Sequence, residues 1–187
     1  MDPTTDSVAI IRWGVVLGAS LAAALIDIKS RRIPNVLTLP LLAAGLIQAG
    51  LFDGFDGLKS SLLAMVVLAL PYVLLFIFAG GGAGDAKLMG AIGAWLGLSG
   101  GVVALVAISI CAVVLALLKA IFAKRFSEVL NGIRVKLLLF MFFLSTKGAA
   151  KYTGGMETAD DKDALTIPYG PAIFAGLVAA AVYTWLK

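Results

Sequence analysis

The stretch Gly80–Gly93, GGGAGDAKLMGAIG, decides how the sequence around it can fold. It follows a long apolar run that ends in LLFIFA, and it places four glycines and the carboxylate of Asp85 directly in front of another apolar run. An ionisable side chain against apolar segments is costly unless the protein shields it or uses it. We therefore expect Asp85 to have a structural or a functional role at the start of an apolar helix.

The composition is that of an integral membrane protein. Of the 187 residues, 61% are hydrophobic and 14% are charged, and the mean hydropathy is +1.03, which leaves too little polar surface to cover a soluble globule. The chain has no histidine and one cysteine, Cys111, inside an apolar run. Disulfide frameworks, the usual zinc sites and nucleophiles activated by histidine are thus excluded, and we expect no metal and no cofactor.

At about 20 residues per helical crossing, the sequence predicts one all-α, polytopic transmembrane domain over residues 1–187, with about six spans and one interfacial helix. The predicted spans are Val8–Ile28, Val36–Phe52, Leu58–Ala79, Ala86–Leu98, Val102–Ala123 and Ile167–Leu186. The fourth span is too short for a hydrocarbon core about 30 Å thick, so we expect its start, with Asp85, to lie below the membrane surface and be shielded by protein. The basic piece Lys124–Ser145 is predicted to be the interfacial helix.

Basic residues indicate the orientation, because lysine and arginine accumulate on the cytoplasmic side of a membrane. They follow the first span and lie at or after the fifth: Lys29, Arg31, Arg32, Lys119, Lys124, Arg125, Arg134, Lys136, Lys147 and Lys151. This pattern predicts that the N-terminus lies outside and that the first, third and fifth connections are cytoplasmic. Asp27, at the end of the first span, and Asp85, at the third connection, are then on the same side.

Each aspartate alone has a structural explanation. Asp27 could pair with a nearby cation at the interface, and Asp85 could cap the helix that follows it. Together they suit peptide hydrolysis, in which one carboxylate takes a proton from water and the other donates one to the carbonyl oxygen. The alternatives are a proton- or cation-coupled carrier that uses both aspartates as its ion site, and a structural subunit.

The glycines next to Asp85 suit the first of these possibilities, although a plain turn would also tolerate them and a transport site would suit them too. Gly82 and Gly84 allow close backbone approach, which an extended peptide beside a reactive carboxylate needs. Lys87 is expected to tune the pair or support the structure, with binding of a lipid phosphate or a direct catalytic role as the alternatives.

Three motifs in this order resemble those of the type IV prepilin peptidases, membrane aspartic peptidases with a Gly-x-Gly-Asp signature. They are Asp27 with Lys29 and IPN (Ile33–Asn35), GAGDAK (Gly82–Lys87), and PYGPAI (Pro168–Ile173). The resemblance covers nearly the whole chain and implies that Asp27 and Asp85 are catalytic. It implies supporting or substrate-binding roles for Lys29, Pro34, Asn35, Gly82, Gly84, Lys87, Pro168, Tyr169, Gly170 and Pro171.

The resemblance also implies the reaction and its setting. The family cleaves prepilins and pseudopilins after a glycine that ends a short basic leader, at the cytoplasmic face of the bacterial inner membrane. The long form carries an N-terminal cytoplasmic region with paired cysteines and methylates the new terminus. This sequence lacks that region and resembles the short form of Flp/Tad-type pili, with an archaeal preflagellin peptidase as the alternative, so we expect no methyltransferase activity.

The expected partners are a prepilin or pseudopilin substrate and membrane lipids, with no nucleic acid. An acidic run before the last span is a candidate for attracting the basic leader, and a solvated loop is the plainer alternative. Its members are Glu157, Asp160, Asp161 and Asp163.

Overall fold

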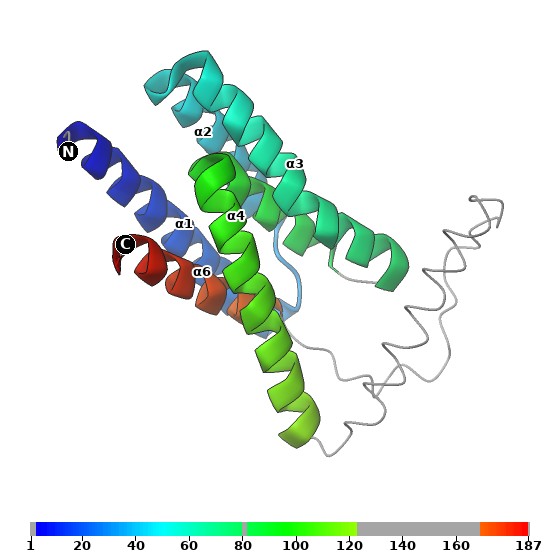
Figure 1. The fold of residues 1–187 in the computed structure, drawn as a ribbon. Helices are drawn as coiled ribbons and strands as arrows, with labels where there is room; N and C mark the ends of the chain where they lie inside the picture. Colours follow the sequence, from blue (N-terminus) through cyan, green and yellow to red (C-terminus); the bar gives the residue numbers. More distant parts are fainter. Residues whose placement is uncertain (1–2, 80–81, 123–168, 187) are drawn as a thin grey trace, which may run out of the picture. The chain divides into compact units, whose positions relative to one another are not determined.

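The computed structural model describes residues 3–79, 82–122 and 169–186, in which all regular structure is α-helical. The helices are α1 (Pro3–Ser30), α2 (Asn35–Phe52), α3 (Gly54–Ala79), α4 (Ala83–Phe122) and α6 (Tyr169–Leu186) (Figure 1). Residues 1–115 and 168–187 form one compact unit, which holds every contact discussed below. The second unit, residues 116–167, contributes the last turns of α4 to the described residues.

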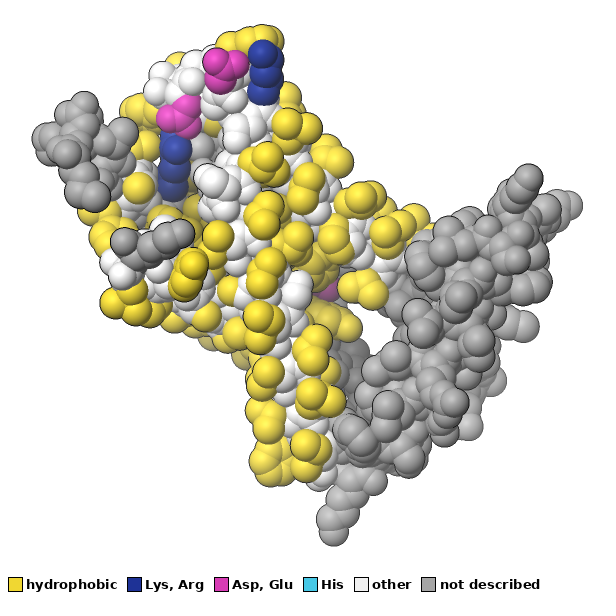
Figure 2. Space-filling view, in the orientation of Figure 1, with side chains coloured by type: hydrophobic (Ala, Val, Ile, Leu, Met, Phe, Trp, Pro, Cys, Tyr) yellow, Lys and Arg dark blue, Asp and Glu magenta, His cyan; other side chains and the backbone are white. Residues whose placement is uncertain are grey.

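All five described helices are long and apolar enough to cross a membrane. They point many large apolar side chains outward, such as Ile11, Ile47 and Leu51, and Figure 2 shows hydrophobic side chains over most of the visible face. In water such a surface would be strongly unfavourable, whereas lipid tails cover it without cost. The predicted all-α, polytopic membrane fold is therefore confirmed.

The predicted spans agree with the helices, including the break between the fourth and fifth spans. Both spans lie within the continuous stretch α4, but the chain turns at Gly97 with φ 65° and ψ −173°, which divides α4 into two helices. Glycine adopts this positive φ without the penalty that a Cβ brings. The predicted break within GLSGG is therefore confirmed, and a single glycine makes the turn.

The neighbours of α4 show that the chain reverses at this turn. Before it, Gly90 lies against Met65 and Gly97 lies against Ser60. After it, Gly101 lies against Leu68, so the chain runs back along α3. The first part of α4 is therefore a short inner helix, as expected for the segment that begins beside Asp85.

Small residues let the helices approach closely. A Cβ on Gly93 would lie 2.5 Å from the carbonyl oxygen of Ala64, so the first part of α4 packs directly on the backbone of α3. Gly176 of α6 packs in the same way on the backbone of Ile108. Such contacts are the usual basis of helix packing within membranes, and they surround a core of fully buried side chains that includes Leu68, Leu88, Met89, Ile92, Ile173 and Leu177.

The predicted interfacial helix, Lys124–Ser145, and the start of the last predicted span at Ile167 lie outside the described residues.

Candidate active site

Asp27 lies in the last turns of α1 and is buried, with 7% of its surface exposed. Its Oδ2 accepts a hydrogen bond of 2.9 Å from the backbone N–H of Gly170, at the start of α6. The described residues thus hold this carboxylate by a backbone amide from another helix, and not by a neighbouring cation. This contact favours a specific role for Asp27 over a side chain that reaches for the membrane surface.

Asp85 lies in the first turn of α4 and is 8% exposed. The helix begins at Ala83, so Asp85 stands inside it and not at the capping position that its structural explanation assumed. Its side chain folds back over Gly82, where a Cβ would lie 2.8 Å from Oδ2 of Asp85. Gly82 therefore makes the room that this carboxylate occupies.

The two buried carboxylates lie within electrostatic reach of each other, although they come from α1 and α4. Two tyrosines share this neighbourhood, because Tyr72 of α3 and Tyr169 of α6 both interact electrostatically with Asp85. Tyr72 is 8% exposed and was not singled out from the sequence. The signal that could have found it is a phenol within the otherwise apolar run ALPYVLLF.

The first motif, at Ile33–Asn35, contacts the second motif, Gly82–Lys87, through backbone and side-chain atoms. A Cβ on Gly84 would lie 3.0 Å from the Cβ of Ile33 and 3.1 Å from its carbonyl oxygen. Next to this contact, Nζ of Lys87 donates a hydrogen bond of 2.8 Å to Oδ1 of Asn35. Lys87 therefore ties the start of α4 to the start of α2, which supports the structural role expected for it.

The third motif packs onto Asp27. A Cβ on Gly170 would lie 2.9 Å from both the Cα of Ala24 and the Cβ of Asp27, so α6 meets α1 at a position that only glycine fits. Pro171 is half-buried at the start of α6, beside the more exposed Tyr169. The three motifs, separated along the sequence, thus meet at one end of the helical unit.

The remaining candidate residues are less closely engaged. Lys29 is exposed in the last turn of α1, and Pro34 is the half-buried N-cap of α2. Pro168 and the acidic run of Glu157, Asp160, Asp161 and Asp163 lie outside the described residues. In the part of the chain that the structure describes, no group of three or more histidine, cysteine, aspartate or glutamate side chains is placed to hold a metal ion.

The fold and this site define a multi-pass membrane protein with a buried pair of aspartates at one end of its helices. Residues 14–117 match the type IV leader peptidase family, and the chain belongs to that family. The resemblance inferred from the three motifs is therefore confirmed.

Curated relatives carry a related name. The chain is 40% identical over 94 residues to a prepilin leader peptidase/N-methyltransferase of Neisseria gonorrhoeae, covering 46% of this chain and 32% of the relative. It is 38% identical over 87 residues to the protein of that name from Dickeya chrysanthemi, covering 43% and 30%. The chain thus spans about a third of the length of these relatives, and no solved structure matches it.

Proposed function

We propose that this protein is a membrane-embedded aspartic endopeptidase that removes the short basic leader from type IV prepilins or pseudopilins. The observation that carries the proposal is the convergence of the three motifs on Asp27 and Asp85, which are buried together within electrostatic reach of each other. The family match and the designation of the relatives support the same reaction.

Hydrolysis of a peptide bond by an aspartic peptidase requires two carboxyl groups, which Asp27 and Asp85 provide, and a water molecule. A water molecule between the two carboxylates loses a proton to the ionised one and attacks the carbonyl carbon of the scissile peptide bond. The other aspartate, a protonated carboxylic acid, gives its proton to the carbonyl oxygen. The product of these two steps is a tetrahedral diol. Breakdown of the diol breaks the C–N bond, and a proton moves to the leaving amine. The two carboxylates share these roles as one unit, because they lie within electrostatic reach of each other.

The surroundings prepare the pair for this reaction. The N–H of Gly170 fixes the orientation of the Asp27 carboxylate, and the missing Cβ of Gly82 leaves room for the carboxylate of Asp85. Burial excludes bulk water, so charge interactions inside the site are stronger than at the surface. We propose that an extended substrate backbone lies beside Asp85, as expected from the sequence, although Gly84 itself packs against Ile33.

We further propose that the site faces the cytoplasm of a bacterium, with the N-terminus of α1 on the other side of the inner membrane, because basic residues cluster at the end of α1. We extend to this chain only the peptidase part of the relatives' designation, since the site offers the groups for hydrolysis. For the substrate we favour a prepilin of a Flp/Tad-type pilus, because the sequence resembles the short form of the family that is found with those pili.

The test is cleavage of a purified prepilin by the purified protein in detergent. The expected result is loss of the leader as a discrete shift in mass, absent from Asp27→Asn and Asp85→Asn preparations that remain folded. A carrier that uses the same two aspartates would instead show proton or cation uptake into liposomes without any cleavage.

A further inference from the structure

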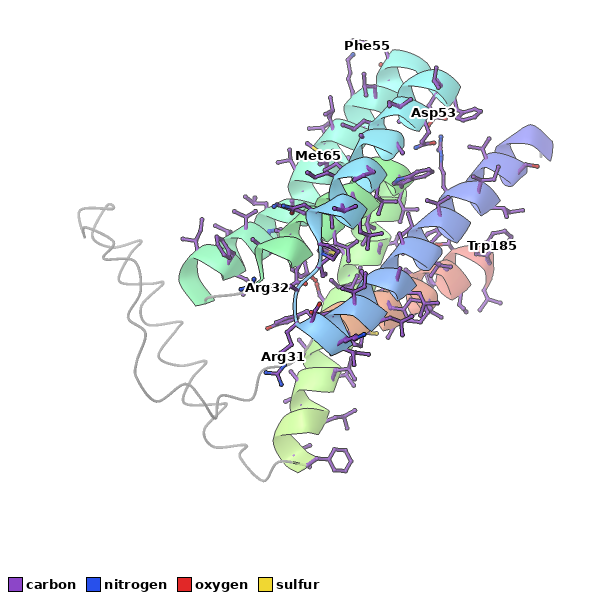
Figure 3. All side chains as sticks on the ribbon, turned by 180° about the vertical axis from the view of Figure 1, so that it is seen from behind. Arg31, Arg32, Asp53, Phe55, Met65 and Trp185 are labelled. Atoms are coloured by element: carbon purple, nitrogen blue, oxygen red, sulfur yellow. The ribbon has the colours of Figure 1, made fainter. Side chains whose placement is uncertain are left out.

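A second site lies at the end of the helical unit away from the aspartate pair. Arg12 stands 15 residues before Asp27 on the same helix, which corresponds to about 22 Å along its axis. Here a cavity of about 520 Å³ opens between α1, α4, α6 and the end of α2. Figure 3 shows the two ends of the unit, with Arg31 and Arg32 at one and Asp53 at the other. The cavity is therefore separate from the peptidase site.

A pair of opposite charges lines this cavity. Nη2 of Arg12 contacts Oδ2 of Asp53 at 2.6 Å, and the two side chains are 20% and 42% exposed. Nε of Arg12 also donates a hydrogen bond of 2.8 Å to Gln48, whose amide in turn donates to the carbonyl oxygen of Trp95 at 3.4 Å. The guanidinium is thus held in a fixed orientation, with further N–H groups beyond those two bonds.

The other walls give the cavity an amphipathic character. Apolar surface comes from Trp13, Phe52, Leu96 and Val103, and hydroxyl groups come from Ser99 and Thr184. Asp56 and Lys59, one turn further along α3, form a second and more exposed ion pair, and Figure 2 shows acidic and basic side chains together where α2 ends and α3 begins. Charges at the ends of membrane spans lie at the level of the lipid headgroups, so the cavity opens at that level.

We propose that this cavity binds a phospholipid whose headgroup carries a primary ammonium group. Its phosphate would accept hydrogen bonds from Arg12, and its ammonium would donate to Asp53. Its acyl chains would extend out of the cavity along the apolar side chains that line it. Guanidinium and phosphate form strong charge-assisted hydrogen bonds, and an ammonium pairs with a carboxylate in the same way. The volume lies within the range of about 300–1,000 Å³ that is usual for ligand sites.

Charge complementarity selects this lipid over an anionic one. A phosphatidylglycerol headgroup brings a negative phosphate beside the carboxylate of Asp53 and offers no cation in return. A zwitterionic headgroup matches both members of the Arg12–Asp53 pair without breaking it. Since the cavity is lined by α1 and by α4, a bound lipid would also hold together the two helices that carry Asp27 and Asp85.

The test is native mass spectrometry of the full chain, stripped of lipid in detergent and titrated with phosphatidylethanolamine or phosphatidylglycerol of the same acyl chains. We expect half-saturation with phosphatidylethanolamine at a concentration about tenfold lower, the effect of one hydrogen bond to a charged group. Asp53→Asn should abolish this preference, and Arg12→Gln should weaken the binding of both lipids. Asp56→Asn, a carboxylate at the same end that does not line the cavity, should bind like the unchanged protein.

A third variant guards against misfolding of the first two. Ser99→Trp keeps both charged residues and places a large side chain at a residue that lines the cavity, so it should lose bound phosphatidylethanolamine while its thermal unfolding temperature stays unchanged. Equal binding of the two lipids by the unchanged protein overturns the proposal. So does an intact preference in folded Asp53→Asn, or in Ser99→Trp. Because lipid binding is read directly, the result is independent of peptidase activity.

Discussion

The backbone N–H of Gly170 donates a hydrogen bond of 2.9 Å to the carboxylate of Asp27, although 143 residues separate them in the sequence. The bond forms because α6 approaches α1 so closely that a Cβ at position 170 would lie 2.9 Å from the Cα of Ala24. One glycine thus brings the two helices together and orients a proposed catalytic carboxylate.

Gly170→Ala tests this relationship. The added methyl group would meet the backbone of α1, which cannot move as a flexible side chain can, so we expect a loss of stability of about 1–3 kcal/mol and at least about a tenfold lower rate of prepilin cleavage. Thermal unfolding and a cleavage time course measure the two effects. Gly18→Ala, on α1 where a Cβ meets nothing within 4 Å, is the control and should leave both unchanged. Normal cleavage by Gly170→Ala would show that the contact does not orient Asp27.

The hydrogen bond between Lys87 and Asn35 provides a second test. Both side chains are exposed, so the bond is screened by solvent and should contribute about 0.5–1 kcal/mol. We expect Lys87→Ala and Asn35→Ala each to lower the cleavage rate by about two- to fivefold. The double variant should be no worse than the single ones, because the first substitution already breaks the bond.

The control for this cycle is the exposed pair of Asp56 and Lys59 at the other end of the unit. Lys59→Ala removes a lysine of similar exposure and should not change the cleavage rate. Fully additive losses in the double variant of Lys87 and Asn35 would mean that the two residues act separately.

The sequence predicted most helix boundaries because apolar runs and prolines mark them clearly. The end of α2 at Phe52 and the end of α3 at Ala79 agree with the predicted spans. The turn was predicted within GLSGG, but the sequence does not say which of its three glycines makes it, because tertiary contact selects Gly97. The N–H of Leu98 donates to Oγ of Ser60 at 3.1 Å, which fixes the turn against α3.

The residues of the site also divide into those that the sequence predicts and those that only the structure reveals. Asp27 and Asp85 were predicted because an acidic residue beside an apolar span is conspicuous in any sequence. Tyr72 and the ion pair of Arg12 with Asp53 were not, because a tyrosine in an apolar run is usually packing, and the two charges lie 41 residues apart. Only the packing of α1, α2, α3 and α4 reveals what these side chains face.

The distribution of basic residues predicts the orientation of the chain in the membrane. A reporter enzyme that works only in the periplasm should be active when it is inserted at Gly54, at the start of α3. The same reporter in the 147–155 segment should be inactive, because Lys147 and Lys151 within that segment predict a cytoplasmic position. The reverse result would place the aspartate pair at the outer face and would exclude cleavage of a cytoplasmic leader.

The central prediction concerns the aspartates themselves. Asp27→Asn and Asp85→Asn should each remain folded and inserted in the membrane but lose at least about a hundredfold in cleavage rate, because an amide can neither accept the proton of the attacking water nor donate one to the carbonyl oxygen. The two losses should be similar, and the double variant should be no slower than either one, since a single substitution already disables the unit. Cleavage time courses measured on monodisperse preparations provide the comparison.

Asp56→Asn is the matched control, an exposed carboxylate at the far end of the unit, and it should cleave normally. Gly84→Val should reduce cleavage for a different reason, because a branched side chain would collide with the backbone of Ile33, only 3.1 Å from a Cβ at that position. If folded Asp27→Asn or Asp85→Asn retained near-normal cleavage, hydrolysis by the aspartate pair would be excluded. Proton uptake into liposomes containing the unchanged protein, and its loss in the same two variants, would then support the carrier instead.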